Sequence, residues 1–196
     1  MFAGIVEGLA EVVKIDYLKP GLRLHIKLGK FSKNLKHGSS VCISGCCLTA
    51  TKIKNNIAVF DVMPETLNKT YFPELKAGNK VNVERSLRLG QEVGGHFVYG
   101  HIDCAGKIIK KVIMKDFSEM EIEFPKEFSH LLIDKGSIAV EGISLTVVKA
   151  ESGKFTIALI PTTLKMTTLG IKKEGDVVNI EFDQMAKYVA KIMAKN

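Results

Sequence analysis

The most constraining feature of the chain is an internal repeat. Compared with itself at an offset of 97 residues, the sequence matches window 31–85 to window 128–182 with 17 identities in 55 positions, where chance predicts about three. The identical pairs include Gly45 with Gly142, Leu48-Thr49 with Leu145-Thr146, Pro64 with Pro161, Asn82 with Asn179 and Glu84 with Glu181. At an offset of 96 the openings also correspond, Gly4-Ile5-Val6-Glu7 with Gly100-His101-Ile102-Asp103. The chain is therefore a duplication, and it has to form two similar domains.

Each half predicts mainly β-structure. Short apolar or alternating runs, separated by Gly, Asn and Lys turns, lie at residues 57–63, 81–84, 138–140, 155–160 and 177–182. A half of about 90 residues with roughly six short strands cannot cover two open sheet edges, whereas a closed barrel has none. We expect an all-β protein made of two homologous six-stranded Greek-key barrels, residues 1–95 and 96–183. Short helices are expected near 31–35 and 125–132.

The last segment, residues 184–196, predicts a helix with no copy in the first half. Met185, Val189, Ile192 and Met193 fall on one face at helical spacing. This apolar face has to be buried either by self-association or by packing back on its own barrel, and periodicity alone leaves both open.

Composition excludes several classes of protein. The chain has 196 residues and 46% hydrophobic content, enough to bury a core without crosslinks. Its net charge of +7 comes from lysines scattered among acids, which indicates a mixed solvated surface and no nucleic-acid partner. The longest run without Lys, Arg, Asp or Glu, residues 37–51, is too short and polar to cross a membrane. Glu7 and Glu11 without a basic lead-in argue against a secretory signal, so a cytoplasmic location is expected.

Four cysteines, Cys42, Cys46, Cys47 and Cys104, lack the C-x-x-C spacings of a zinc module and the density of a disulfide scaffold. We expect free thiols in a reducing compartment.

The stretch from Gly94 to Asp103 joins the two halves and carries His96 and His101. Its glycines favour a hinge or a backbone crossing. Three explanations compete for the two histidines, Asp103 and Cys104: a metal site, imidazoles bonded to nearby backbone, and a proton-transfer role for one histidine in a ligand pocket. The metal site is the weakest, because alternating strand side chains would not all face one way and the first half has no matching ligands.

A repeated Gly-x-x-Leu-Thr motif places a small reactive group in each half. Residues 45–49 carry Cys47 where residues 142–146 carry Ser144. On a strand each of these shares a face with the following threonine, Thr49 or Thr146. A tight turn into a barrel strand would need no reactive group, but the divergence of Cys47 from Ser144 favours a pair of related sites. A second repeat, Pro-x-Thr-Leu-x-x-Thr at 64–70 and 161–167, offers hydroxyls and backbone groups for a planar heterocycle.

These motifs together resemble the riboflavin synthase family over the whole chain. They are the opening Met1-Phe2-Ala3-Gly4-Ile5-Val6-Glu7, the two Gly-x-x-Leu-Thr motifs, Glu65-Thr66-Leu67, Gly94-Gly95-His96, Gly100-His101-Ile102-Asp103, and Val178-Asn179-Ile180-Glu181-Phe182-Asp183. The sequence departs from the family at Ala3, where Thr is usual, and at Ala50, where Val is common. Ala3 removes any hydroxyl role at that position.

The resemblance implies the dismutation of two molecules of 6,7-dimethyl-8-ribityllumazine. A four-carbon unit passes from one to the other and gives riboflavin and 5-amino-6-(D-ribitylamino)uracil, with no cofactor and no metal. It also implies a homotrimer assembled by the C-terminal helix, in which the N-terminal half of one subunit faces the C-terminal half of its neighbour, and an association with lumazine synthase. The alternative is an antenna-type protein of the same fold that binds lumazine or flavin without catalysis.

The resemblance also implies the site residues. His101, Ser144 and Cys47 are the expected catalytic residues, with His101 and Ser144 relaying a proton from a substrate 7-methyl group and Cys47, or a water it positions, attacking C7 of the other substrate. His101, Lys135, Ser144 and Thr146 are expected in the C-terminal half-site, and Phe2, Gly4, Ile5, Cys47, Thr49 and Thr66 in the N-terminal one. The full set expected to bind substrate is Phe2, Gly4, Ile5, Val6, Cys47, Leu48, Thr49, Asp61, Val62, Met63, Pro64, Glu65, Thr66, Gly100, His101, Ile102, Lys135, Ser144, Leu145, Thr146, Ala158, Leu159, Ile160, Pro161, Thr162 and Thr163.

Overall fold

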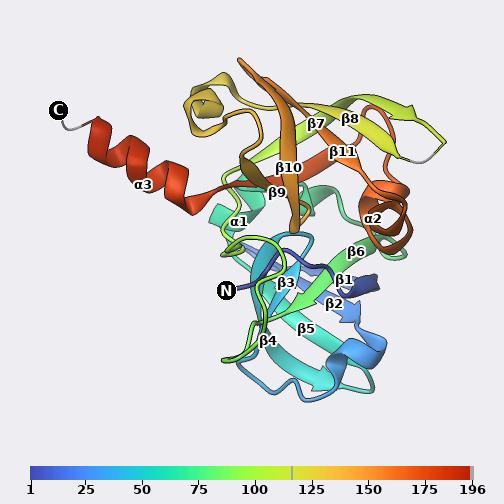
Figure 1. The fold of residues 1–196 in the computed structure, drawn as a ribbon. Helices are drawn as coiled ribbons and strands as arrows, with labels where there is room; N and C mark the ends of the chain where they lie inside the picture. Colours follow the sequence, from blue (N-terminus) through green and yellow to red (C-terminus); the bar gives the residue numbers. More distant parts are fainter. Residues whose placement is uncertain (116, 195–196) are drawn as a thin grey trace.

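Two closed antiparallel barrels make up most of the molecule (Figure 1). The computed structural model describes residues 1–115 and 117–194. The first barrel has the order β1-β2-β5-β4-β3-β6. Its strands are β1 (Gly8–Tyr17), β2 (Leu22–Lys27), β3 (Ser40–Ile43), β4 (Cys46–Lys54), β5 (Ile57–Val62) and β6 (Lys80–Arg85).

The second barrel has the same connectivity, β7-β8-β11-β10-β9-β12 read around the closed sheet. Its strands are β7 (Cys104–Ile113), β8 (Ser118–Glu123), β9 (Ser137–Val140), β10 (Ile143–Glu151), β11 (Lys154–Leu159) and β12 (Val177–Phe182). Register shifts fall at equivalent places, in β1 and β7 and again in β4 and β10. Such bulges help bend strands around a barrel. The prediction of a duplicated all-β double barrel is confirmed.

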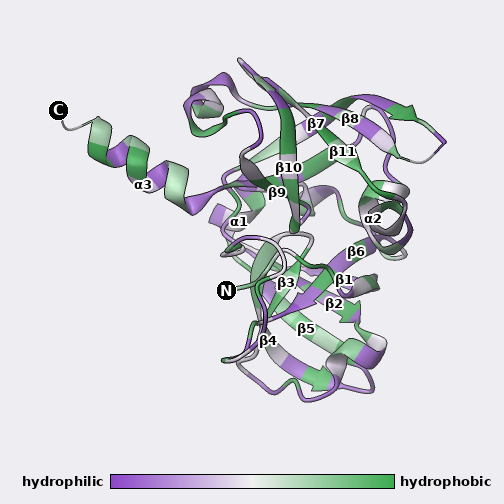
Figure 2. Ribbon diagram, viewed as in Figure 1, coloured by the Kyte–Doolittle hydropathy of each residue, from purple (hydrophilic) through white to green (hydrophobic). Residues whose placement is uncertain are grey.

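Each barrel encloses its own apolar core. Strand side chains alternate between interior and exterior, which sends Leu24, Ile26 and Phe60 into the first core and Met120, Ile122 and Phe155 into the second. Figure 2 shows the same pattern as alternating hydrophobic and hydrophilic residues along the strands. The barrel interiors are therefore filled with side chains, and a ligand has to bind on the outside.

Two hairpin turns meet where the barrels touch. The turn between β3 and β4 and the turn between β9 and β10 each have two residues with positive φ, Ser44 (41°) with Gly45 (87°) and Glu141 (55°) with Gly142 (77°). Positive φ at both positions is typical of tight two-residue hairpins. A Cβ on Gly45 would lie 2.8 Å from the Gly142 nitrogen, so only glycine allows this contact.

Two buried asparagines lock the barrels together across this contact. The Asn82 side chain on β6 donates to the Glu141 carbonyl at 2.9 Å, and the Asn179 side chain on β12 donates to the Ser44 carbonyl at 2.9 Å. Exchanging the two halves of the chain converts one of these hydrogen bonds into the other. The molecule therefore has an approximate internal twofold, and the repeated Asn82 and Asn179 are explained by packing.

The segments that precede the barrels cross between them. Phe2 and Val98 pair through two backbone hydrogen bonds of 2.7 and 3.1 Å. Beyond this pair, the Val6 side chain enters the core of the second barrel, and the Ile102 side chain enters the core of the first. Each half thus lends a segment to the other half's barrel. The expected boundary near Gly95 stays a prediction.

Short helices connect the strands. Gly29–Ser32 (η1) and Lys126–Leu131 (η3) are 3₁₀ helices close to the two helices expected there, and Phe72–Glu74 (η2) and Thr168–Gly170 (η4) are two more. The α-helices α1 (Pro64–Lys69) and α2 (Pro161–Met166) follow β5 and β11. Sequence periodicity did not predict them, because a six-residue helix is too short to show an apolar stripe. Proline at the first helical position favours a helix start here.

The helix α3 (Gln184–Met193) extends away from both barrels (Figure 1). Its first turn is capped by Asp183, which accepts from the Met185 N–H at 2.9 Å. An ion pair of 2.6 Å between Lys187 and Asp103 holds the helix base against the second barrel. Residues 195 and 196 of the expected helical segment lie outside the described residues. Among the described helices, the length and apolar character needed to cross a bilayer are lacking.

Candidate functional site

Cys47 lies in a small pocket on the outside of the first barrel. Along β4 the side chains alternate, so that Cys46 and Leu48 are buried while Cys47 is partly exposed. The Cys47 N–H donates to the Gly100 carbonyl at 2.8 Å. The pocket has a volume of about 260 Å³ and is lined by Cys46, Cys47, Glu65, Thr66, Lys69, Thr70, Gly100, His101 and Ile102. Glu65, Thr66 and His101 therefore surround the thiol, as members of the first half-site.

Burial separates Cys47 from the other cysteines. Burial raises the pKa of Cys46 and that of Cys104 to about 12, and raises the pKa of Cys42 well above its ordinary value. A nucleophilic cysteine has to reach the thiolate form and has to be accessible. Cys47 is the cysteine of the described chain that meets the access condition.

Ser144 occupies the equivalent place on the second barrel. Its N–H donates to the Gly4 carbonyl at 2.8 Å, as Cys47 does to Gly100. Its Oγ lies 2.7 Å from Nδ1 of His96. Burial lowers the pKa of His96, and Asp183 only partly opposes this. A neutral imidazole beside a hydroxyl can accept a proton, which suits a general base.

The backbone approaches Ser144 as closely as glycine allows. A Cβ on Gly95 would clash with the Ala3 carbonyl oxygen and would lie 2.7 Å from Ser144 Oγ, and a Cβ on Gly4 would lie 2.6 Å from Ser144 Cβ. Glycine at position 95 therefore lets the chain pass close enough to Ser144 for His96 to contact it. This explains a motif whose role the sequence left open between hinge and pocket.

The crossing segments change the grouping expected for the site. Within one chain His101 lies with Cys47, and Gly4 lies against Ser144. Within one chain the structure therefore brings neither His101 to Ser144 nor Gly4 to Cys47, and the expected roles of these residues stay predictions. The physical reason is that residues 2–6 and 98–102 pass to the opposite barrel. The histidine that contacts Ser144 is His96, which the sequence analysis singled out without assigning the role.

Several residues expected to bind substrate have side chains inside the protein. Val6, Leu48, Val62, Ile102 and Leu159 are buried in the two barrel cores, Phe2 is buried in a separate cluster with Val98 and Ala139, and Leu145 packs against the second core. Apart from Ile102, which also lines the Cys47 pocket, and the partly exposed Leu145, these residues can reach a ligand mainly through their backbone.

The remaining expected residues lie at the barrel surfaces. On the first barrel they are Thr49, Asp61, Met63 and Pro64, and on the second Lys135, Thr146, Ala158, Ile160, Pro161, Thr162 and Thr163; Ile5 is half exposed on its crossing segment. Asp61 is engaged by Arg23 through bonds of 2.6 and 3.0 Å. Their contacts with a substrate stay a prediction.

Asp103 and Cys104 have structural roles. Asp103 accepts from the Phe182 N–H at 2.9 Å in addition to its ion pair with Lys187. The Cys104 side chain packs in the second core.

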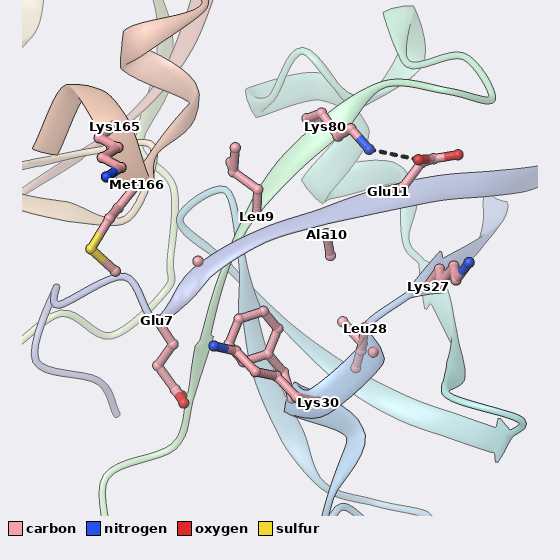
Figure 3. Close-up of a pocket in the computed structure, with 13 residues that line it drawn as sticks. Glu7, Leu9, Ala10, Glu11, Lys27, Leu28, Lys30, Lys80, Lys165 and Met166 are labelled. Atoms are coloured by element: carbon pink, nitrogen blue, oxygen red, sulfur yellow. Dashed lines mark hydrogen bonds and ion pairs between the residues drawn. The ribbon is translucent and has the colours of Figure 1, made fainter. Parts of the chain in front are cut away.

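Larger grooves lie elsewhere on the molecule. One of about 650 Å³ lies between β1, η1 and α2 (Figure 3), where Lys80 pairs with Glu11 at 2.6 Å and Lys165 and Met166 reach over from the second barrel. It contains neither Cys47 nor Ser144. Cys47 thus lies in a pocket smaller than the roughly 300–1,000 Å³ typical of ligand sites, as expected for one wall of a larger site.

Comparison with known proteins agrees with the duplication of the chain. The sequence model of the lumazine binding domain matches the chain twice, at residues 3–86 and 99–183. The chain is 41% identical to the riboflavin synthase of Mycobacterium bovis, with 98% of each chain covered. It is 42% identical to the riboflavin synthase of Escherichia coli K12, covering 96% of this chain and 90% of the relative.

Solved structures with a similar fold include LumP complexed with riboflavin, with a TM-score of 0.88 and 26% identity over 94% of this chain and 100% of LumP. LumP complexed with 6,7-dimethyl-8-(1'-D-ribityl) lumazine gives a TM-score of 0.86 at the same identity and coverage. The lumazine-binding repeat matches both halves of the chain, each half contributes a segment to the other, and the near-full-length relatives share one activity. The chain therefore belongs to the riboflavin synthase family of enzymes.

Proposed function

We propose that the protein catalyses the dismutation of two 6,7-dimethyl-8-ribityllumazine molecules. A four-carbon unit leaves one molecule and joins the other, which yields riboflavin and 5-amino-6-(D-ribitylamino)uracil without an external oxidant. The observation that carries the proposal is the pair of half-sites, alike in backbone and unlike in reactive groups. A reaction between two identical molecules needs two similar pockets with different chemistry. Holding both in one geometry can lower the barrier by about 7–11 kcal/mol.

The Ser144 half-site is the better place for proton removal from a 7-methyl group. His96 lies 2.7 Å from Ser144 Oγ and is kept neutral by burial, which lowers its pKa. With hydrogen on its Nε2, His96 accepts the serine proton through Nδ1, and Ser144 can then take a proton from the substrate. Thr146 shares this outer face of β10.

The Cys47 half-site is the better place for the molecule that is attacked. Cys47 is partly exposed, and His101 and Glu65 line the same pocket. The thiol, or a water it positions, adds at C7 of the bound lumazine, a π electron pair moves from C7 into the conjugated ring, and His101 takes the proton that the attacking group releases. The Thr66 hydroxyl and the Gly100 backbone can contact the heterocycle and fix the orientation of its ring plane for this attack.

We propose that a complete site forms between two copies of the chain. No residue of the Ser144 half-site lines the Cys47 pocket, so one chain does not present both reactive groups to one cavity. Met185, Tyr188, Val189, Ile192 and Met193 on α3 are 56–69% exposed, and burying them against other copies supports a homotrimer. A cytoplasmic location stays a prediction from the sequence, and an association with lumazine synthase stays a prediction from the resemblance.

Turnover tests the function directly. Purified protein mixed with 6,7-dimethyl-8-ribityllumazine alone is expected to form one riboflavin for every two lumazines consumed. The double variant Cys47→Ser with Ser144→Ala is the control, and it should bind lumazine without forming riboflavin.

The second candidate function is non-catalytic lumazine binding, favoured by the structural likeness to LumP. Tight lumazine binding by the folded wild-type protein without any riboflavin formation would establish it and reject the enzyme.

A further inference from the structure

The repeated Val-Asn-x-Glu strand carries two buried glutamates that the reaction does not use. Glu84 on β6 and Glu181 on β12 are 5% and 2% exposed. Each glutamate lies two residues after the asparagine that locks the barrels, so the glutamate and asparagine side chains project from the same face of their strand. The asparagines explain the barrel contact, and the glutamates need an explanation of their own.

Glu84 connects the first barrel to the reactive group of the second. Its Oε1 accepts from the Ala3 N–H at 2.7 Å. The next residue, Gly4, accepts from the Ser144 N–H at 2.8 Å. A carboxylate on one barrel therefore sets the segment that abuts the serine of the other.

Glu181 makes the reciprocal connection. Its two oxygens accept from the Tyr99 N–H at 2.6 Å and from the His101 N–H at 2.7 Å. Between these residues, Gly100 accepts from the Cys47 N–H at 2.8 Å. The carboxylate thus fixes His101 itself and the backbone that abuts the thiol.

Close packing allows little movement in the segment that joins Glu84 to Ser144 or in the segment that joins Glu181 to Cys47. A Cβ on Gly4 would lie 2.6 Å from Ser144 Cβ, and a Cβ on Gly100 would lie 2.6 Å from Cys47 Cβ. A displacement of either crossing segment has to displace the reactive side chain. Misplacement of a reacting group by about 1 Å can cost about 100-fold in rate.

We propose that Glu84 and Glu181 are positioning residues that act crosswise, Glu84 on the Ser144 half-site of the second barrel and Glu181 on the Cys47 half-site of the first. The inference rests on the proposed function for what the half-sites do, but the geometry it describes can be measured without turnover. Each glutamate acts through a backbone segment and does not touch the substrate.

The test compares Glu84→Gln with Glu181→Gln in the full-length protein. Two readouts report the half-sites separately: the rate at which iodoacetamide labels Cys47, followed by peptide mass spectrometry, and the NMR titration of His96, assigned with His96→Gln. Glu181→Gln should raise the Cys47 labelling rate severalfold and leave the His96 titration unchanged. Glu84→Gln should move the His96 titration toward the ordinary histidine value and leave Cys47 labelling unchanged.

The matched control is Glu123→Gln, an exposed glutamate of β8, which should change neither readout. Absence of labelling at buried Cys42, Cys46 and Cys104 shows that the barrels stay closed. If a glutamine variant does not fold, the aspartate variant keeps the charge, withdraws the carboxylate by one methylene and is tested in the same way.

Folded variants that change both readouts equally, affect only the half-site of their own barrel, or change neither would overturn the crosswise assignment. If wild-type protein forms no riboflavin but the crosswise pattern appears, the proposed function fails and the positioning role stands. If turnover is normal and the pattern is absent, the positioning role fails alone.

Discussion

The two half-sites differ at side chains that occupy equivalent positions of the repeat. Cys47 corresponds to Ser144, and His101 corresponds to Ile5. The backbone contacts around them are the same, since Gly100 accepts from Cys47 and Gly4 accepts from Ser144 at 2.8 Å. The scaffold has therefore kept its symmetry, whereas the reactive groups have diverged.

His96 is expected to be essential for turnover but not for binding. In His96→Gln the hydrogen-bonding capacity at Ser144 is kept in part, whereas the base is lost, so kcat should fall about 100-fold or more. The lumazine Kd, from fluorescence titration, should change by only a few-fold. His37→Gln is the control, because His37 is exposed on a loop of the first barrel. Normal turnover in folded His96→Gln would remove His96 from the mechanism.

Glu84 gives the stability of the fold a pH dependence. Burial raises the pKa of Glu84 to about 7 from its ordinary 4.5, against the lowering effect of the Ala3, Gly4 and Ile5 N–H groups. Between pH 4.5 and about 7 the Glu84 carboxyl is therefore protonated in the folded state and ionised in the unfolded state. The resulting contribution to the free energy of unfolding is complete below pH 4.5 and is lost as the pH rises through 7.

Urea unfolding of wild type and Glu84→Gln at pH 5 and pH 8 measures this effect. The stability of wild type relative to the variant should fall by about 2 kcal/mol between the two pH values. A difference that does not change with pH, or that changes in the opposite direction, contradicts the raised pKa.

At the residue scale the sequence singles out Cys47 and Ser144 as a candidate reactive pair, which stays a prediction, but it does not indicate the residues that contact them. Cys47 and Ser144 follow from the repeat, because a motif that is constant around a variable small residue marks a site. The contact of His96 with Ser144 joins residues 48 positions apart. It depends on a backbone crossing between barrels, and neither strand alternation nor the repeat indicates that crossing.

At the scale of elements, the two hairpin turns at Gly45 and Gly142 define how the barrels meet. Gly45→Ala should destabilise the protein by about 2–4 kcal/mol, because it adds both a strained positive φ and a methyl 2.8 Å from the Gly142 nitrogen. Thermal and urea unfolding measure the loss.

Gly78→Ala is the matched control for Gly45→Ala. Gly78 also has a positive φ, +92°, but a Cβ there would meet nothing within 4 Å, so only the strain of about 1 kcal/mol is expected. Equal losses in the two variants would show that the barrel contact tolerates the methyl group.

The helix α3 is expected to hold copies of the chain together. Ile192→Glu places a charge on its exposed apolar face and should convert a trimer to monomer in light scattering. Lys191→Glu, on the same helix next to that face, should leave the mass unchanged. A wild-type protein that is monomeric and fully active would show instead that α3 does not mediate assembly and that the site needs no second copy.

Strands and α3 were predictable because their apolar patterns run over enough residues to show a period. The helices α1 and α2 were not, because six residues carry little periodicity and their prolines also fit a strand end. The crossing of residues 2–6 to the second barrel was not predictable, since a segment's own sequence does not say which core its apolar residue enters.

At the scale of the whole molecule, the proposed function divides the described part of the chain into two half-sites, neither of which is a complete site. The Cys47 pocket and Ser144 lie on opposite barrels, on either side of the Gly45–Gly142 contact. Joining the two requires that the first barrel of one copy face the second barrel of another. Under the proposed function the duplication would let each chain supply both kinds of half-site to its neighbours.

Complementation between inactive chains tests this claim most directly. Cys47→Ser and Ser144→Ala chains are co-expressed with different tags, purified together through both tags, and assayed for riboflavin formation. Mixed assemblies can pair the intact Cys47 of one chain with the intact Ser144 of another, so they should recover a substantial fraction of wild-type turnover. Turnover no higher than that of the separate variants, in assemblies shown to contain both chains, would contradict a site shared between subunits.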